Sequence, residues 1–147
     1  MITIRNAKIT DVEALLLLLE QLGYPTAKEE LEKRFARFLA SEGYGVAVAC
    51  NIDQIVGFVA WSKSKLFVSD SIRIHIEGLV VDKEYRGKAV GKNLMLFAEE
   101  YARSCGPAII DLTSGLRRAE DGSHQFYDKL GYKNEGLMAK LYLRKEV

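Results

Sequence analysis

Residues 77–95 read EGLVVDKEYRGKAVGKNLM, and the order of features in this stretch indicates a particular local fold. Apolar residues 79–81 run into charged ones, two glycines, Gly87 and Gly91, lie in a basic segment, and helical spacing of apolar residues begins at Val90. A helix start presents unpaired N–H groups and about half a positive charge, and glycine allows an anion to approach the backbone closely. The stretch therefore predicts a strand, an anion-binding loop and a helix, in that order.

The composition of the 147-residue chain is that of a globular protein, with 48% hydrophobic and 28% charged residues. Lys and Arg number 21 against 20 Asp and Glu, so the net charge of +1 favours neither nucleic acid nor an anionic membrane as a partner. Cys50 and Cys105 each end an apolar segment, which predicts structural thiols in a reducing compartment. No signal peptide is apparent, and the leucine run 15–19 is much shorter than the roughly 20 residues of a membrane helix. We therefore expect a cytoplasmic protein.

Apolar periodicity predicts a mixed α/β fold, with a central sheet that is mostly antiparallel and about four helices. Capping-box spacing at Thr10 and at Thr26 predicts helices that run to about Leu22 and about Ala40. The other expected elements are strands at 2–5, 45–50, 55–61, 72–81, 108–112 and 137–143, and helices at 89–104 and 119–130. A helix between strands 72–81 and 108–112 predicts a parallel pair joined by a crossover. We expect one domain over residues 1–147.

Three known phosphate loops could explain the basic segment. A P-loop needs a wider glycine spacing, and Asn93 stands where its Ser or Thr would be. The dinucleotide fingerprint needs a G-x-G-x-x-G pattern after a first strand, which is not present here. The third pattern, R-x-x-G-x-G/A, matches residues 86–91, which read RGKAVG, except that Ala89 stands at its first glycine. A second motif, LTSGLRRAEDGSHQFYDKLGY, follows this segment at residues 112–132.

With both motifs in this order, the chain resembles the GNAT superfamily of N-acetyltransferases over nearly its whole length. The resemblance implies a GNAT-like sheet and a loop whose backbone cradles the pyrophosphate of acetyl-coenzyme A (acetyl-CoA). It implies contacts to this cosubstrate from Leu79, Val80, Val81, Arg86, Gly87, Lys88, Ala89, Val90, Gly91 and Lys92. Three positions depart from the family pattern. Ala89 replaces a usual glycine, Glu120 a frequent asparagine, and Asp121-Gly122 interrupts a helix start.

The resemblance also implies a catalytic pair. Tyr127 would protonate the departing thiolate, although a packed aromatic residue beside Phe126 is the alternative. Glu77 would accept the amine proton, directly or through water, although a charge on the strand surface is the alternative. We expect it to share a face with Leu79 and to be desolvated among apolar neighbours. A backbone N–H near Leu79 or Val80 would stabilise the oxyanion.

Other groups compete for these roles. His124 or water are rival bases. For His75 a structural role is more plausible, and Arg117-Arg118 could steer a substrate carboxylate or a phosphate of the coenzyme. No Cys/His/Asp cluster has metal-ligand spacing.

These features together predict an acetyl-CoA-dependent N-acetyltransferase that acts by direct attack in a ternary complex. Its acceptor would be a primary amine of a small molecule or protein, contacted by the first two helices. The alternative is a non-catalytic acyl-CoA-binding sensor or subunit. The leucine-rich first helix and the apolar last strand suggest a homodimer.

Overall fold

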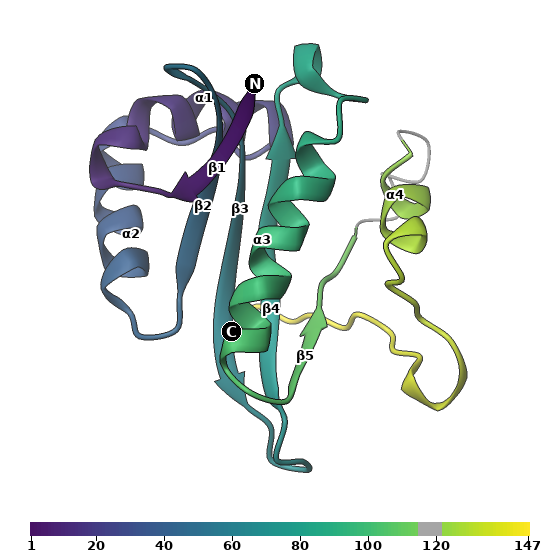
Figure 1. Cartoon of the computed structure of the whole chain (residues 1–147). Coiled ribbons are helices and arrows are strands. Elements are labelled where there is room, and N and C mark those ends of the chain that lie inside the picture. Colours follow the sequence, from purple (N-terminus) through teal and green to yellow (C-terminus); the bar gives the residue numbers. More distant parts are fainter. Residues whose placement is uncertain (115–121) are drawn as a thin grey trace. The chain divides into compact units, whose positions relative to one another are not determined.

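The computed structural model describes residues 1–114 and 122–147 (Figure 1). The chain divides into two compact units, Met1–Ile110 and Asp111–Val147, and each is described by itself. The elements up to residue 111 are β1 (Ile2–Asn6), η1 (Ile9–Asp11), α1 (Val12–Leu22), α2 (Lys28–Ala40), β2 (Gly45–Asn51), β3 (Gln54–Lys65), β4 (Ile72–Val81), η2 (Lys83–Tyr85), α3 (Val90–Ser104) and β5 (Ala108–Asp111). They are followed by α4 (Ser123–Lys129) and η4 (Gly136–Met138).

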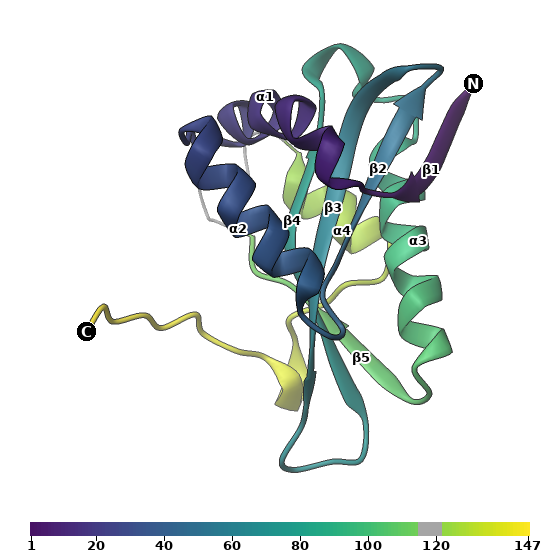
Figure 2. The same cartoon turned by 90° about the vertical axis from the view of Figure 1, so that its left-hand side faces the viewer.

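The five strands form one sheet in the order β1-β2-β3-β4-β5. The first four strands pair antiparallel with their neighbours, and β5 joins β4 as a parallel strand after the α3 crossover. Helices α1 and α2 cover one face of the sheet and α3 covers the other (Figures 1 and 2). This mixed sheet with four helices confirms the predicted fold class.

Each face of the sheet has its own layer of buried side chains. On the α1/α2 face, Leu18 and Phe35 pack with Phe58 of β3 in one apolar cluster. Helix α1 is not buried all round, because Leu17 is 64% exposed. On the α3 face, Leu94 and other residues of the same helix are fully buried.

Trp61 of β3 belongs to the α3 layer. Its ring centroid lies 6.3 Å from that of Phe97 and 5.2 Å from that of Tyr101, both on α3. The indole also covers Gly45, its cross-strand partner, where a Cβ atom would collide with the ring. The α3 layer is therefore closely packed around this tryptophan.

The starts of α1 and α2 differ from the predicted capping boxes, and both predictions are wrong. Asp11 precedes α1, and its carboxylate accepts hydrogen bonds from the Lys8 N–H (2.7 Å) and from Arg5 of β1 (2.8 Å). The hydrogen bond from Arg5 holds the pKa of Asp11 below its usual value, against the opposing effect of burial. Helix α2 follows Ala27, with no side-chain cap. Before α1, a capping box therefore lies two residues earlier than predicted, between Lys8 and Asp11, and Arg5 of β1 adds a contact to it.

Helix α4 confirms the predicted helix from residue 123 to residue 129; the first predicted residues lie outside the described part. The predicted strand 137–143 is wrong. Gly136–Met138 form a turn of 3-10 helix, and the backbone N–H and C=O of Lys140 bond to the Asn134 side chain (2.7 and 3.2 Å). These bonds use backbone groups that a strand neighbour would need.

Candidate active site

Strand β4 contains a β-bulge at Glu77, in the middle of its pairing with β3. Ala60 pairs with Gly78, but Trp61, the next residue of β3, pairs with Ile76, so no β3 residue lies opposite Glu77 in the strand register. An extra residue in one strand reverses the alternation of side chains beyond it. Ile76 therefore lies on the α3 face with Trp61, whereas Gly78 lies on the α1/α2 face with Ala60.

The bulge also places Glu77 on the α1/α2 face. Its carboxylate is exposed, and Oε2 accepts a hydrogen bond of 2.6 Å from the Ser62 hydroxyl of β3. Leu79 pairs with Val59 and faces the other way. The expectation that Glu77 shares a face with Leu79 and is desolvated is thus wrong, because strict alternation does not hold through a bulge. Gly78 in the strand interior was the available signal for this irregularity.

A cavity of about 640 Å³ opens beside Glu77, between the sheet and helices α1 and α2. Most of its wall is apolar and comes from the two helices, the segment that joins them and strands β2 and β3. Its charged lining residues are Glu30 and Arg34 of α2 together with Glu77. The volume lies within the range of small-molecule sites.

The loop before α3 has the backbone of an anion-binding turn. Gly87 (φ 77°) and Ala89 (φ 64°) both adopt left-handed conformations. The N–H of Asn93 bonds to the Ala89 carbonyl oxygen (3.0 Å) as the first hydrogen bond of α3, so the N–H groups of residues 90–92 have no partner within the helix. This geometry, together with the helix dipole, suits the pyrophosphate of a coenzyme.

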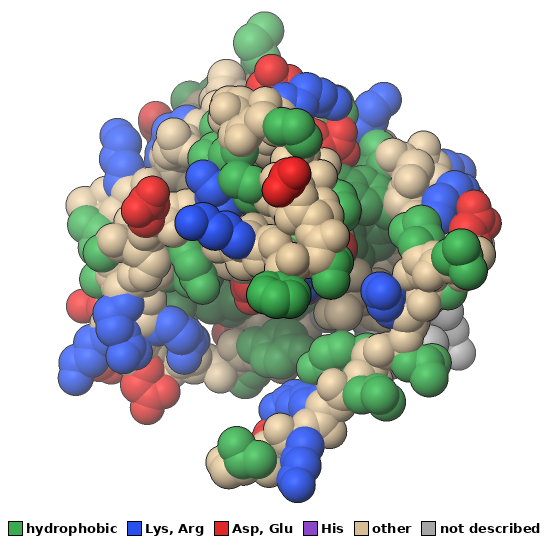
Figure 3. All heavy atoms as spheres, turned by 90° about the horizontal axis from the view of Figure 1, so that it is seen from below, with side chains coloured by type: hydrophobic (Ala, Val, Ile, Leu, Met, Phe, Trp, Pro, Cys, Tyr) green, Lys and Arg blue, Asp and Glu red, His purple; other side chains and the backbone are tan. Residues whose placement is uncertain are grey.

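Exposed basic side chains surround this loop. The Lys88 ammonium lies 5.3 Å from the centre of the Tyr85 ring, and Arg86 Nε donates to the Val81 carbonyl oxygen at 3.3 Å. Lys92 is exposed on the first turn of α3. These cations give the loop a positive charge, and since the whole protein is nearly neutral, this charge is local. On the face shown in Figure 3, the charges of both signs are interspersed.

The end of β4 extends past its parallel neighbour. Strand β5 has four residues and β4 has ten, and the Ile72 N–H bonds to the Pro107 carbonyl oxygen (2.9 Å) just before β5 begins. Strand β5 therefore lies beside the first part of β4. Among the described residues, 79–81 of β4 extend beyond it, which leaves backbone groups on that edge for a ligand.

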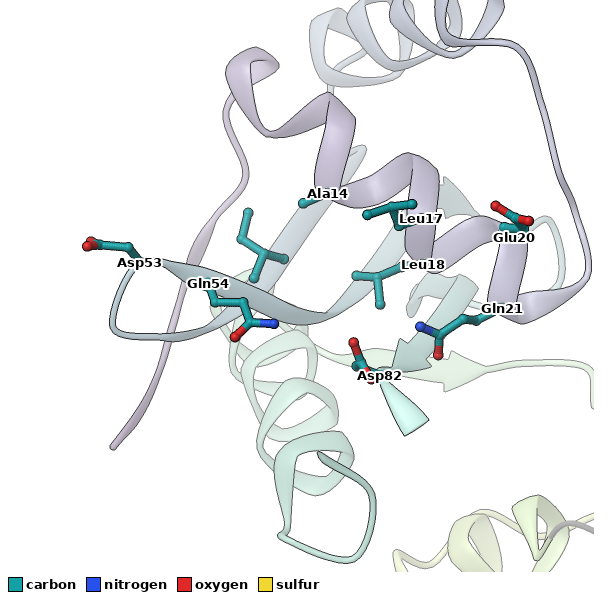
Figure 4. Close-up of a pocket in the computed structure, with 9 residues that line it drawn as sticks. Ala14, Leu17, Leu18, Glu20, Gln21, Asp53, Gln54 and Asp82 are labelled. Atoms are coloured by element: carbon teal, nitrogen blue, oxygen red, sulfur yellow. The ribbon is translucent and has the colours of Figure 1, made fainter. Parts of the chain in front are cut away.

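A second hollow, of about 590 Å³, lies between α1, the β2–β3 turn and the end of β4 (Figure 4). Its charged lining residues are Glu20, Asp53 and Asp82, with no Lys or Arg among them. Three carboxylates would repel phosphate. This hollow is therefore a poor site for a coenzyme pyrophosphate.

Tyr127 belongs to the second unit, on α4, where it is half-buried. Its ring meets Phe126 edge-on, with 5.1 Å between centroids, and that of Tyr132 at 6.2 Å. His124 lies on the same helix. The family-motif positions Gly115, Arg117, Arg118, Glu120 and Asp121 lie outside the described residues.

His75 has a local partner in the first unit. Its Nδ1 lies 3.0 Å from Arg73 Nη2, which fits the structural role predicted for this histidine. Within residues 1–114 and 122–147, no three His, Cys, Asp or Glu side chains are grouped as metal ligands would be. In the same residues, no helix is long and apolar enough to cross a membrane.

Comparison with known proteins agrees with this geometry. A model of the acetyltransferase (GNAT) family matches residues 12–132. The aminoalkylphosphonate N-acetyltransferase of Salmonella typhimurium is 27% identical over 135 residues, which cover 88% of this chain and 84% of that protein. The glucosamine 6-phosphate N-acetyltransferase of Arabidopsis thaliana is 26% identical over 119 residues, which cover 78% and 76%.

A solved aminoglycoside N-acetyltransferase in complex with CoA has the same fold, with a TM-score of 0.85 at 18% identity over 100% of this chain and 96% of that one. These similarities identify the protein as an acyl-transferring enzyme. The chain belongs to the acetyltransferase (GNAT) family, since the family match covers well over half of its residues. The family predicted from the two motifs is confirmed.

Proposed function

We propose that the protein transfers the acetyl group of acetyl-CoA to a primary amine of a small molecule, by direct attack within a ternary complex. The observation that carries this proposal is the bulge in β4, which turns a carboxylate into a cavity large enough for an acceptor. The named relatives act on small amines, an aminoalkylphosphonate and glucosamine 6-phosphate, which favours a small acceptor over a protein.

The coenzyme loop would hold the pyrophosphate through the N–H groups of Val90, Gly91 and Lys92. Gly87 and Ala89 keep the loop backbone turned, and Arg86 and Lys88 add positive charge. The exposed edge at residues 79–81 would pair with the pantetheine amides. The CoA complex of the aminoglycoside enzyme supports this cosubstrate for the fold.

When bound, acetyl-CoA supplies an activated acetyl thioester, and side chains and backbone groups of the protein transfer the protons and stabilise the charge. Glu77 would accept a proton from the amine, directly or through water, as the nitrogen forms its bond to the acetyl carbon. A backbone N–H near Leu79 or Val80 would donate to the carbonyl oxygen. The Tyr127 hydroxyl would give its proton to the sulfur as the carbon–sulfur bond breaks.

The test is a screen of primary amines for thiol release from acetyl-CoA, with mass spectrometry of the acetylated product. A true acceptor should give equal amounts of thiol and N-acetyl product, and Glu77→Gln should slow both. Tight acetyl-CoA binding without transfer to any amine would instead support the non-catalytic sensor or subunit.

The protein would act in the cytoplasm as a homodimer. Leu137, Leu141 and Leu143 are 84–106% exposed in the second unit, and Leu17 is exposed on α1. Apolar side chains in such number favour a partner surface. Sedimentation equilibrium tests this, and Leu141→Asp with Leu143→Asp should shift a dimer toward monomer.

A further inference from the structure

The cavity beside Glu77 has a largely apolar wall that includes four aromatic side chains. Phe35, Phe38 and Phe58 line it together with Tyr24. The Phe38 ring is fixed edge-on by Tyr44, with 5.0 Å between ring centroids. Such a wall stabilises an apolar body by removing it from water.

The charges of the cavity favour an ammonium group and disfavour a second anion. Two carboxylates, Glu30 and Glu77, line it against one guanidinium, Arg34, which leaves one negative charge in excess. Glu30 and Arg34 are four residues apart on α2, so they are neighbours on that helix. For an anionic substrate, the attraction of Arg34 would therefore already be offset by the two carboxylates.

Glu77 has one oxygen left for this ammonium. The Ser62 hydroxyl occupies Oε2, and within the described part of the chain Oε1 has no hydrogen-bond partner. Gly78 beside it adds no side chain to the cavity. The amine nitrogen can therefore approach the carboxylate while its apolar body lies along the aromatic wall.

We propose that the acceptor is a primary monoamine with an aromatic or branched apolar body and no phosphate or phosphonate group, bound with its ammonium at Glu77. This substrate class rests on the proposed acetyl transfer, and it differs from the acceptors named for the two relatives. Arg34 then keeps the edge of the cavity hydrated and does not bind the substrate directly.

The test measures binding apart from turnover, by calorimetry with free CoA at saturation and three probes: 2-phenylethylamine, ethylamine and 2-aminoethylphosphonate. We expect 2-phenylethylamine to bind at least about tenfold more tightly than ethylamine, because the ring is buried. We expect it to bind more tightly than the phosphonate by a similar factor. Glu77→Gln should weaken 2-phenylethylamine binding, and Arg34→Gln should leave it unchanged or tighten it.

Gly78→Ala provides a variant that should fold, because its Cβ would lie 3.5 Å from the Phe58 ring, an ordinary contact. It narrows the cavity and should weaken 2-phenylethylamine more than ethylamine. If 2-aminoethylphosphonate bound more tightly than 2-phenylethylamine, and Arg34→Gln abolished this binding, the substrate class would be overturned. Acetyl transfer to the phosphonate would still preserve the proposed function. Absence of binding by every probe would also overturn the class. Selective binding of 2-phenylethylamine without any transfer would keep the class and refute the proposed activity.

Discussion

Ser62 donates a hydrogen bond of 2.6 Å to Glu77 across strands β3 and β4, at the point where the bulge interrupts their pairing. This bond fixes the direction of a carboxylate that would otherwise be free to rotate on the surface. We predict that Ser62→Ala lowers kcat by about tenfold, the equivalent of about 1.4 kcal/mol, with little change in the KM for acetyl-CoA. Ser62→Thr should restore kcat, since it keeps the hydroxyl. Ser64→Ala, in an exposed position on the same strand, is the control, and equal losses in both variants would contradict the role of Ser62.

Ala89 stands in a left-handed conformation that costs an L-residue roughly 1–2 kcal/mol. We predict that Ala89→Gly stabilises the protein by about 0.5–1 kcal/mol in denaturant unfolding and does not weaken acetyl-CoA binding. Ala36→Gly is the matched control, because Ala36 is exposed within α2 and should lose about 1 kcal/mol. The same Ala→Gly substitution is therefore expected to raise the free energy of unfolding at position 89 and to lower it at position 36. A destabilised Ala89→Gly would show that the loop is not strained.

Gly91 lies on the first turn of α3, where a coenzyme pyrophosphate would approach the backbone. Gly91→Val should weaken acetyl-CoA binding at least about tenfold, equal to about 1.4 kcal/mol, in calorimetry on the folded protein. Leu96→Val, in an exposed position further along the same helix, should leave the affinity unchanged. Unchanged affinity in folded Gly91→Val would remove the coenzyme from this loop.

Tyr127→Phe keeps the ring and its edge-on contact with Phe126 but removes the hydroxyl. If this hydroxyl protonates the leaving thiolate, kcat should fall by roughly 100-fold while the affinities for both substrates stay nearly constant. Tyr132→Phe removes the hydroxyl of the neighbouring ring and should retain activity. Wild-type kcat in Tyr127→Phe, with chemistry rate-limiting, would leave Tyr127 with a packing role alone.

Asp11 couples stability to pH, because its pKa in the folded protein is lowered by the hydrogen bond from Arg5. The contribution of Asp11 is present above the unfolded-state pKa, about 3.9, and is lost as pH falls through the lower folded-state value. Asp11→Asn should therefore cost roughly 2 kcal/mol in free energy of unfolding at pH 7, and this difference should shrink below pH about 4. Glu13→Gln, which removes an exposed pair with Lys28, should have a smaller effect. A difference independent of pH would contradict the role of the charge.

The fold was largely predictable because its elements follow simple periodicities. Alternation located β4 and the β2–β3 hairpin, helical spacing located α3, and Gly23 marked the end of α1 with its left-handed φ of 103°. The backbone of the loop before α3 was predictable for a related reason. Its glycine at position 87 and the helix start are local features, and local backbone demands appear directly in the sequence.

The features that escaped prediction depend on contacts between distant parts of the chain. Nothing local in residues 10–13 shows that Asp11 bonds to Arg5 of β1 in preference to a cap at Thr10. Residues 137–143 alternate like a strand, but a strand needs a neighbour, and Asn134 takes the backbone groups of Lys140. The side on which Glu77 lies depends on a pairing irregularity with β3, which alternation within β4 cannot reveal.

The position of Trp61 has a spectroscopic consequence. It is the chain's single tryptophan, it is buried between the sheet and α3, and it pairs with Ile76 directly before the bulge. Its indole N–H has no hydrogen-bond partner among the described residues. The tryptophan fluorescence of the protein therefore arises from one place, on the face of the sheet opposite to Glu77. A ligand that shifts the bulge should change this emission, so binding at the proposed acceptor site can be followed optically without a label.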